Sequence, residues 1–250
     1  MSFIRISDGK SGERNMFYLY NQLNPVVSRL GGRAEIECGE KVNVLNVEID
    51  KSYAGFVRAE AEDKIADVIT VNYKYGYFSE KIRAKGLSDF ERELLLDTLI
   101  CADLEEDKRY VIAKMSRCNE YSIFGSFNFT MTPLKRKWQE IAEYIPLYFN
   151  SEQLREFVLY ILKEKKGKKV YVDNECVYDK NFNRLQRVIL TSDNLEEGKV
   201  IREVLLSACG EVELNDKVPE LDEKYLRDYF GDKILFGKGY FVKSVDKKSI

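Results

Sequence analysis

The first fifty residues alternate short apolar stretches with turn signals, a pattern typical of strands around one helix. Phe3–Ile6 predicts a short strand, and apolar positions at helical spacing predict a helix over residues 13–30 that ends at a pair of glycines. Residues 33–38 and 42–49 predict two strands joined by a tight turn. We therefore expect an N-terminal β-α-β-β unit.

The next part of the chain has longer runs of helical periodicity. Apolar residues at helical spacing, between charged ones in a run of strong helix formers, predict a long helix from Asp50 to about Tyr75. Ser88-Asp89-Phe90-Glu91 is a capping box that opens a second helix, whose Leu-rich run 94–100 is apolar on most sides. Such a helix lies deep in a core. After a short acidic break, a third helix is expected over residues 105–117.

Two amphipathic helices are predicted after residue 130. Thr132-Pro133 is a helix start, and Pro146 is expected to end that helix near Ile145. Residues 150–153 cap the following helix. Each helix has one apolar stripe, so we expect the two to pack as a helical hairpin.

The periodicity changes again in the last third of the chain. The alternation predicts a helix-rich α+β fold, with the N-terminal β-α-β-β unit, a central helical bundle and a small C-terminal mixed sheet with helices. A seam near Cys118–Ser122 would divide it into residues 1–118 and 119–250, and the alternative is one continuous domain. The elements expected after residue 169 are strands at 170–172, 176–178, 187–191 and 211–214, helices at 200–205 (capped by Asp193-x-x-Glu196) and 222–230, and a hairpin near 237–239.

Composition describes an ordinary globular chain. It has 250 residues, 44% hydrophobic and 33% charged, enough for one sizeable core or two small ones. The formal net charge of −2 gives no overall attraction to polyphosphate, so binding to nucleic acid or a membrane surface would need a local patch. The start of the chain lacks the apolar core of a signal peptide, and the longest apolar stretch, residues 94–102, is too short to span a bilayer. We expect a cytoplasmic protein.

Histidine is absent from the whole sequence. Its absence excludes Ser-His-Asp and Cys-His relays, imidazole bases and mixed Cys/His zinc sites. The cysteines are odd in number and far apart, which argues against a disulfide framework or a thiolate metal cage. We expect no catalytic, cofactor or metal site. The cysteines are Cys38, Cys101, Cys118, Cys176 and Cys209.

Short fragments of known motifs occur without their full patterns. Gly9-Lys10-Ser11 lies between a strand and a helix, where a phosphate loop would lie, but the required glycine five positions earlier is Ile4. Gly237-Lys238 is also out of register with its preceding glycine. An ordinary loop and a turn are therefore favoured. Ser7-x-x-Lys10 and Ser192-Asp193-Asn194 match two penicillin-recognising motifs by chance, because the third motif is missing.

Two basic clusters and an aromatic group leave alternatives open. The basic clusters are consistent with solvated helix surfaces or with contacts to RNA, DNA or an acidic protein face. The aromatic group is consistent with packing, which we favour, or with stacking on bases. Carboxylates are plentiful, but no pair is singled out by its spacing. The basic residues are Lys135, Arg136 and Lys137, and Lys163, Lys165, Lys166, Lys168 and Lys169; the aromatic ones are Tyr73, Tyr75, Tyr77 and Phe78; the carboxylates are Glu60, Glu62, Asp63, Glu105, Glu106 and Asp107.

The order of features resembles one protein family. A long helix ends in Tyr75-Gly76-Tyr77-Phe78-Ser79, a Leu-rich helix follows, and Tyr121-Ser122-Ile123 leads to Phe127-x-Phe129 and a pair of amphipathic helices. Over residues 53–210 this arrangement is similar to the YtxC-like sporulation proteins of spore-forming bacteria. The resemblance implies a bacterial cytosolic role linked to sporulation, and it carries no catalytic residue set.

We therefore expect a non-enzymatic protein that acts through contacts with an unknown protein partner. One alternative is an RNA- or DNA-binding module that uses the Lys163–Lys169 patch. The other is a phosphate-handling or metal-dependent enzyme that works without histidine. The sequence leaves the oligomeric state open.

Overall fold

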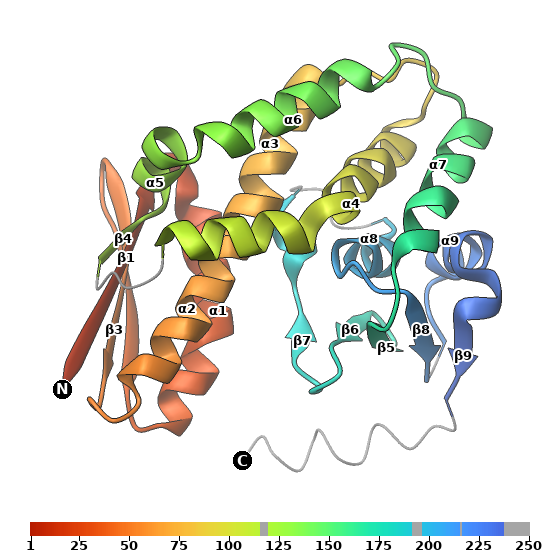
Figure 1. Ribbon diagram of the computed structural model, residues 1–250. Helices are drawn as coiled ribbons and strands as arrows, with labels where there is room; N and C mark the ends of the chain where they lie inside the picture. The colour runs from red at the N-terminus through yellow and green to blue at the C-terminus, as the bar shows by residue number, and fades with distance from the viewer. Residues whose placement is uncertain (116–119, 192–196, 216, 238–250) are drawn as a thin grey trace. The chain divides into compact units, whose positions relative to one another are not determined.

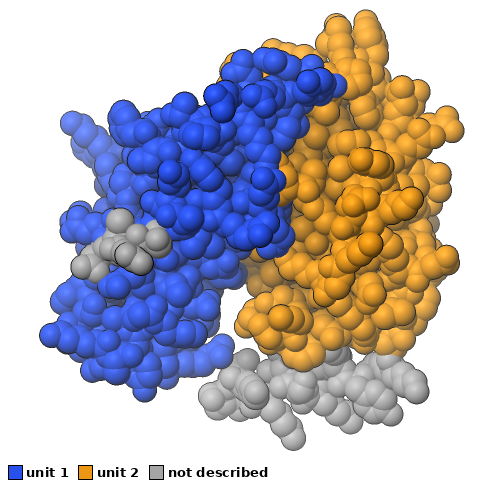
Figure 2. Space-filling view, in the orientation of Figure 1, with its two compact units in different colours: residues 1–78, 104–144 blue, residues 79–103, 145–250 orange. Residues whose placement is uncertain are grey.

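The computed structural model describes residues 1–115, 120–191, 197–215 and 217–237. The chain divides into two units, which Figure 2 colours blue and orange. Unit 1 comprises residues 1–78 and 104–144, and unit 2 comprises residues 79–103 and 145–250. Each unit thus combines two stretches of sequence, and the predicted helix-rich α+β class is confirmed. The seam expected at residues 118–122 lies partly outside the described residues.

Unit 1 contains a four-stranded sheet with the order β2-β3-β1-β4 (Figure 1). β1 (Ser2–Gly9) is antiparallel to β3 (Val42–Ile49), which is antiparallel to β2 (Arg33–Cys38). These strands lie where the sequence predicts them. β4 (Glu120–Ser122), which the sequence analysis did not assign, runs parallel to β1. The carboxyl ends of β1 and β4 therefore lie at the same edge of the sheet.

Helices complete unit 1, and α1 packs against the sheet. α2, η2 and α3 follow one another without a break, so the predicted long helix is present, but it begins at Ala54 rather than near Asp50 and continues to Lys81. Residues 68–73 within it form a π-helix, a rare form that is frequently found at functional sites. The helices of this part of the chain are η1 (Lys10–Gly12), α1 (Glu13–Arg29), α2 (Ala54–Asp67), η2 (Val68–Tyr73), α3 (Lys74–Lys81), α5 (Ile123–Thr130) and α6 (Thr132–Tyr144).

Helix α4 (Asp89–Met115) contributes to both units and is kinked at Asp103, the position of the predicted acidic break. The Ser88–Glu91 capping box forms as predicted: the Ser88 N–H donates to the Glu91 carboxylate at 2.9 Å, and the Glu91 N–H donates to the Ser88 hydroxyl at 3.3 Å. The Leu-rich run 94–100 is buried in unit 2, so the prediction of a core helix is confirmed. None of the helices in the described ranges is both long and apolar enough to cross a bilayer.

Unit 2 is built on a five-stranded sheet with the order β7-β6-β5-β8-β9. β5 and β6 form the predicted hairpin, and β8 lies parallel to both β5 and β9. α7 packs on α9 within this unit, whereas α6, its expected hairpin partner, belongs to unit 1. The elements are α7 (Ser151–Glu164), β5 (Lys169–Asp173), β6 (Cys176–Tyr178), β7 (Arg184–Leu185), η3 (Arg187–Leu190), α8 (Lys199–Leu206), β8 (Glu211–Leu214), α9 (Glu220–Phe230), η4 (Gly231–Lys233) and β9 (Ile234–Phe236).

One predicted strand is wrong. Residues 187–190 form the 3₁₀ helix η3 instead of a strand. The N–H groups of Arg187 and Val188 donate to the buried Glu203 carboxylate at 2.9 and 2.8 Å, so they are not available to a neighbouring strand. The Asp193–Glu196 cap, the Ser192-Asp193-Asn194 fragment and most of the hairpin near 237–239 lie outside the described residues.

Candidate functional site

The basic residues singled out by the sequence are divided between the units. Lys135, Arg136 and Lys137 are on α6 in unit 1, and the five lysines from Lys163 to Lys169 are at the end of α7 and the start of β5 in unit 2. Lys135 donates to the Asn128 carbonyl at 3.0 Å, and Arg136 forms an exposed ion pair with Glu140.

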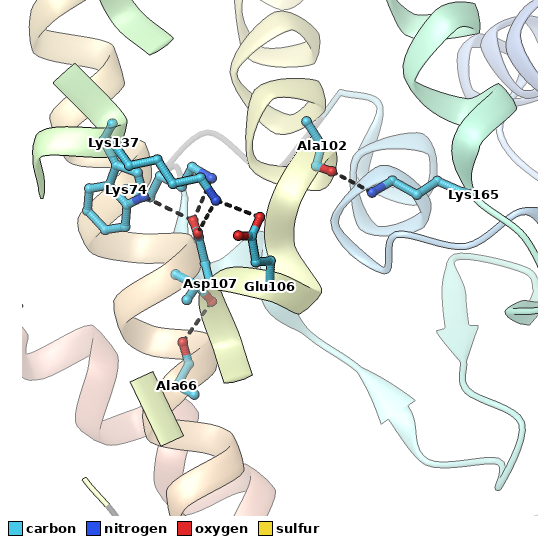
Figure 3. A network of polar contacts seen from close by, with 9 residues as sticks. Ala66, Lys74, Ala102, Glu106, Asp107, Lys137 and Lys165 are labelled. Atoms are coloured by element: carbon cyan, nitrogen blue, oxygen red, sulfur yellow. Dashed lines mark hydrogen bonds and ion pairs between the residues drawn. The ribbon is translucent and has the colours of Figure 1, made fainter. Parts of the chain in front are cut away.

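Several lysines of the second cluster also have internal partners. Lys165 donates to the carbonyl of Ala102 at 2.7 Å (Figure 3). Lys169 pairs with Glu213, whose hydrogen bond raises the pKa of the lysine. Lys163 and Lys166 are exposed. These contacts reduce the charge available to a polyanion, and nucleic-acid binding by this cluster stays a prediction.

The aromatic group on η2 and α3 is packed inside unit 1. Phe78 is fully buried, and the ring centroids of Tyr77 and Trp138 are 6.2 Å apart. The ring centroids of Tyr73 and Phe127 are 4.6 Å apart. These contacts agree with the packing interpretation that the sequence analysis favoured over stacking on bases.

Asp107 is the centre of a buried polar network in unit 1 (Figure 3). Its carboxylate accepts hydrogen bonds from Lys74 Nζ at 2.9 Å, Lys137 Nζ at 2.8 Å and Trp138 Nε1 at 3.0 Å. Burial alone would raise its pKa, but the charge of Lys74 and these hydrogen bonds outweigh burial and lower it. The carboxylate is therefore ionised at neutral pH and holds α3, α4 and α6 together.

A second buried carboxylate, Asp97, lies in unit 2 and has a different environment. It accepts a hydrogen bond from Arg202 Nε at 2.7 Å, and Arg202 Nη2 also contacts Thr191 and Glu93. Burial raises the pKa of Asp97 to about 6 although Arg202 opposes the shift. Both carboxylates are almost fully buried among protein groups.

A pocket of about 810 Å³ opens in unit 1 where β1 and β4 end. Ser7 and Ser122 are partners in the parallel register, and Gly9 and Val42 are partners in the antiparallel register, so four lining residues come from adjacent positions of the sheet. In open α/β sheets, ligands bind outside the carboxyl ends of the strands, and this pocket lies at that end of the parallel pair β1 and β4. The volume is within the range of small-molecule sites.

The lining of this pocket combines cations, hydroxyls and apolar groups. Lys10 and Lys41 are both exposed, and in the described part of the chain neither forms an ion pair. The apolar groups are Val42 and Phe124, which are 45% and 54% exposed. The hydroxyls are those of Ser7, Ser11 and Ser122.

Asp8 provides a fixed acidic group at the base of the pocket. The β alternation that buries Ile4 and Ile6 also places Asp8 on the core face, where it is 3% exposed. Its carboxylate accepts hydrogen bonds from the Tyr73 hydroxyl at 2.6 Å and from Asn15 Nδ2 at 2.7 Å. Burial and the adjacent carboxylate raise the pKa of Tyr73, so the phenol stays protonated and continues to donate.

Aromatic contacts connect the base of the pocket to the Asp107 network. Tyr73, which holds Asp8, contacts Phe127, and the Phe127 ring stacks on Trp138 with 5.7 Å between centroids. Trp138 in turn donates to Asp107. Since Trp138 is the sole tryptophan of the sequence, its fluorescence reports on this connected region.

The sequence held one signal for this pocket, the Gly9-Lys10-Ser11 fragment between a strand and a helix. The register argument against a phosphate loop still holds, because Ile4 is in the middle of β1. What the sequence could not reveal is that Lys41 and Ser122 are brought to the same place by the sheet. The described residues contain no group of three or more side chains suited to hold a metal ion.

Comparison with known proteins gives no match: no family model fits the chain, and no curated protein and no solved structure is significantly similar to it. The resemblance to YtxC-like sporulation proteins and the role it implies therefore stay predictions. Any functional argument has to come from the geometry of the chain itself.

Proposed function

We propose that unit 1 binds a small phosphate-bearing ligand in the pocket at the ends of β1 and β4. The observation that carries the proposal is the pair of exposed lysines, Lys10 and Lys41, on one pocket of small-molecule size without an ion-pair partner in the described ranges. Serine hydroxyls beside them supply further donors to phosphate oxygens.

The competing hypotheses have weaker support. The lysines of the Lys163–Lys169 cluster that contact Ala102 and Glu213 already have partners, whereas Lys10 and Lys41 do not have ion-pair partners among the described residues. The predicted protein partner linked to sporulation rests on the resemblance of the sequence, and no comparison tests it. Phosphate binding corresponds to the phosphate-handling alternative, restricted here to binding because the pocket supplies no assigned catalytic group.

Calorimetric titration with pyrophosphate at low ionic strength tests the proposal. We expect saturable binding that weakens as salt is added, because the contacts are charge-assisted and partly exposed. Lys10→Ala and Lys41→Ala should each weaken binding roughly fivefold, since one exposed charge pair contributes up to about 1 kcal/mol. Lys51→Ala is the matched control, because Lys51 is exposed in the same unit and follows the end of β3 farthest from the pocket.

Two results would contradict the proposal. One is the absence of binding heat at millimolar pyrophosphate. The other is binding that the Lys10→Ala/Lys41→Ala double variant leaves unchanged. Circular dichroism and the emission of Trp138 would verify that each variant keeps its fold, which we expect because both lysines are exposed.

A further inference from the structure

The pocket offers more than cations to a ligand. Phe124 lies in the first turn of α5, lines the pocket, and leaves 54% of its surface exposed. A large aromatic side chain that lines a pocket without being covered has apolar surface that a ligand can bury. A phosphate ion by itself would leave this ring in water.

The Phe124 ring lies beside Gly9. A Cβ added at Gly9 would lie 3.7 Å from Phe124 Cδ2, which is an ordinary van der Waals distance. The ring therefore lies next to the start of η1, where Lys10 follows Gly9, and Val42, the register partner of Gly9, adds a second apolar group. Cationic and aromatic surfaces thus occur side by side in one cavity.

We infer that the ligand is a nucleotide, whose phosphate is held by Lys10 and Lys41 and whose base stacks on Phe124. This inference rests on the proposed phosphate site and names the class of its ligand. Base stacking on an aromatic side chain strengthens binding by about 5-fold to 150-fold, and it tolerates any base because every base has a π-face. The pocket volume of about 810 Å³ accommodates a ligand of this size.

The test compares AMP with inorganic phosphate by calorimetry on the full chain. We expect AMP to bind at least about fivefold more tightly than phosphate. Phe124→Ala should remove this advantage and leave phosphate affinity unchanged, and Phe124→Tyr should preserve it. Phe129→Ala is the matched control, because Phe129 is on the same helix, is 84% exposed and does not line the pocket.

Saturation-transfer NMR gives an independent measurement. With the wild-type protein, the adenine protons of AMP should receive saturation from the protein. With the Phe124→Ala variant, this transfer to the adenine protons should disappear. If phosphate binds and AMP binds no more tightly, or if Phe124→Ala weakens both equally, the nucleotide inference is wrong while the phosphate site stands. If neither ligand binds, both are wrong. Phe124→Leu, which keeps an apolar side chain without a π-face, separates stacking from general apolar contact and should bind AMP as weakly as Phe124→Ala.

Discussion

Two buried aspartates show how the same residue type acquires different properties from its neighbours. Asp107 accepts hydrogen bonds from two lysines and a tryptophan, and its pKa is lowered despite burial. Asp97 has Arg202 as its hydrogen-bonded cation, yet burial dominates and raises its pKa to about 6. In the sequence, Asp97 lies in the Leu-rich run 94–100 and Asp107 in the acidic segment that follows it. Their different pKa values could not be predicted, because the partners of both residues are distant along the chain.

Asp107→Asn is expected to lower the free energy of unfolding by roughly 3–5 kcal/mol, because it breaks the ion pair between two buried groups, Asp107 and the Lys74 ammonium. Glu106→Gln is the control: Glu106 pairs with the same Lys137 but its side chain is 69% exposed, so the loss should stay below about 1 kcal/mol. Urea unfolding followed by Trp138 fluorescence measures both. Equal losses in the two variants would contradict the role assigned to Asp107.

The difference between wild type and Asp107→Asn should also depend on pH. Because the folded-state pKa of Asp107 is depressed, its contribution to stability is fully present above its ordinary value of 3.8 and is lost as the pH falls from there through the folded pKa. The same urea experiments repeated below pH 3.8 should therefore give a smaller difference than at pH 7. A difference that grows in acid would mean that the carboxylate is not stabilised in its ionised form.

At the scale of elements, local signals in the sequence succeeded where local interactions decide the structure. The Asn150–Gln153 capping box opens α7 as predicted, with the Gln153 N–H donating to Asn150 Oδ1 at 2.9 Å. The failures are segments whose backbone groups are satisfied from elsewhere. Residues 187–190 form η3, in which the N–H groups of Arg187 and Val188 donate to the Glu203 carboxylate. The short strand β4 forms by pairing with β1. Single-segment patterns contain no information about such partners.

Two glycine-to-alanine substitutions should have opposite effects. Gly76 is exposed inside the continuous helix of residues 54–81, and a Cβ there meets nothing within 4 Å, so Gly76→Ala should stabilise the protein by roughly 0.5–1 kcal/mol. A Cβ at Gly12 would overlap the Asp8 side chain. Gly12→Ala should therefore destabilise the protein and weaken pyrophosphate binding. The midpoint of thermal unfolding should rise in Gly76→Ala and fall in Gly12→Ala. A stable Gly12→Ala variant with normal binding would show that the Asp8 position is not fixed.

For the whole molecule, the fold class could be predicted and the assembly could not. Periodicity is local, so it located most helices and strands of both sheets. A division of the sequence at residues 118 and 119 is the simplest assumption, yet residues 104–144 join residues 1–78 through β4 and the Asp107 network. The pocket has the same origin: Lys10, Lys41 and Ser122 come together only once β1, β3 and β4 form one sheet.

Hydrogen exchange on the full chain tests this assembly, because local opening follows cooperative units rather than sequence order. Asp107→Asn should raise exchange in residues 1–78 and 104–144, including α6, and leave residues 79–103 and 145–215 nearly unchanged. Asp97→Asn should do the reverse, since it removes a partner of the buried Arg202 guanidinium in unit 2.

Helix α4 provides the sharpest comparison, because its two halves lie in different units on either side of the kink at Asp103. Each variant should accelerate exchange in one half and spare the other, although both halves belong to a single helical segment. Uniform acceleration along α4 would mean that the two units unfold as one. A response of α6 to Asp97→Asn, with none to Asp107→Asn, would instead restore a boundary at residues 118 and 119. The exchange pattern of these two segments thus decides between a division by sequence order and a division by packing.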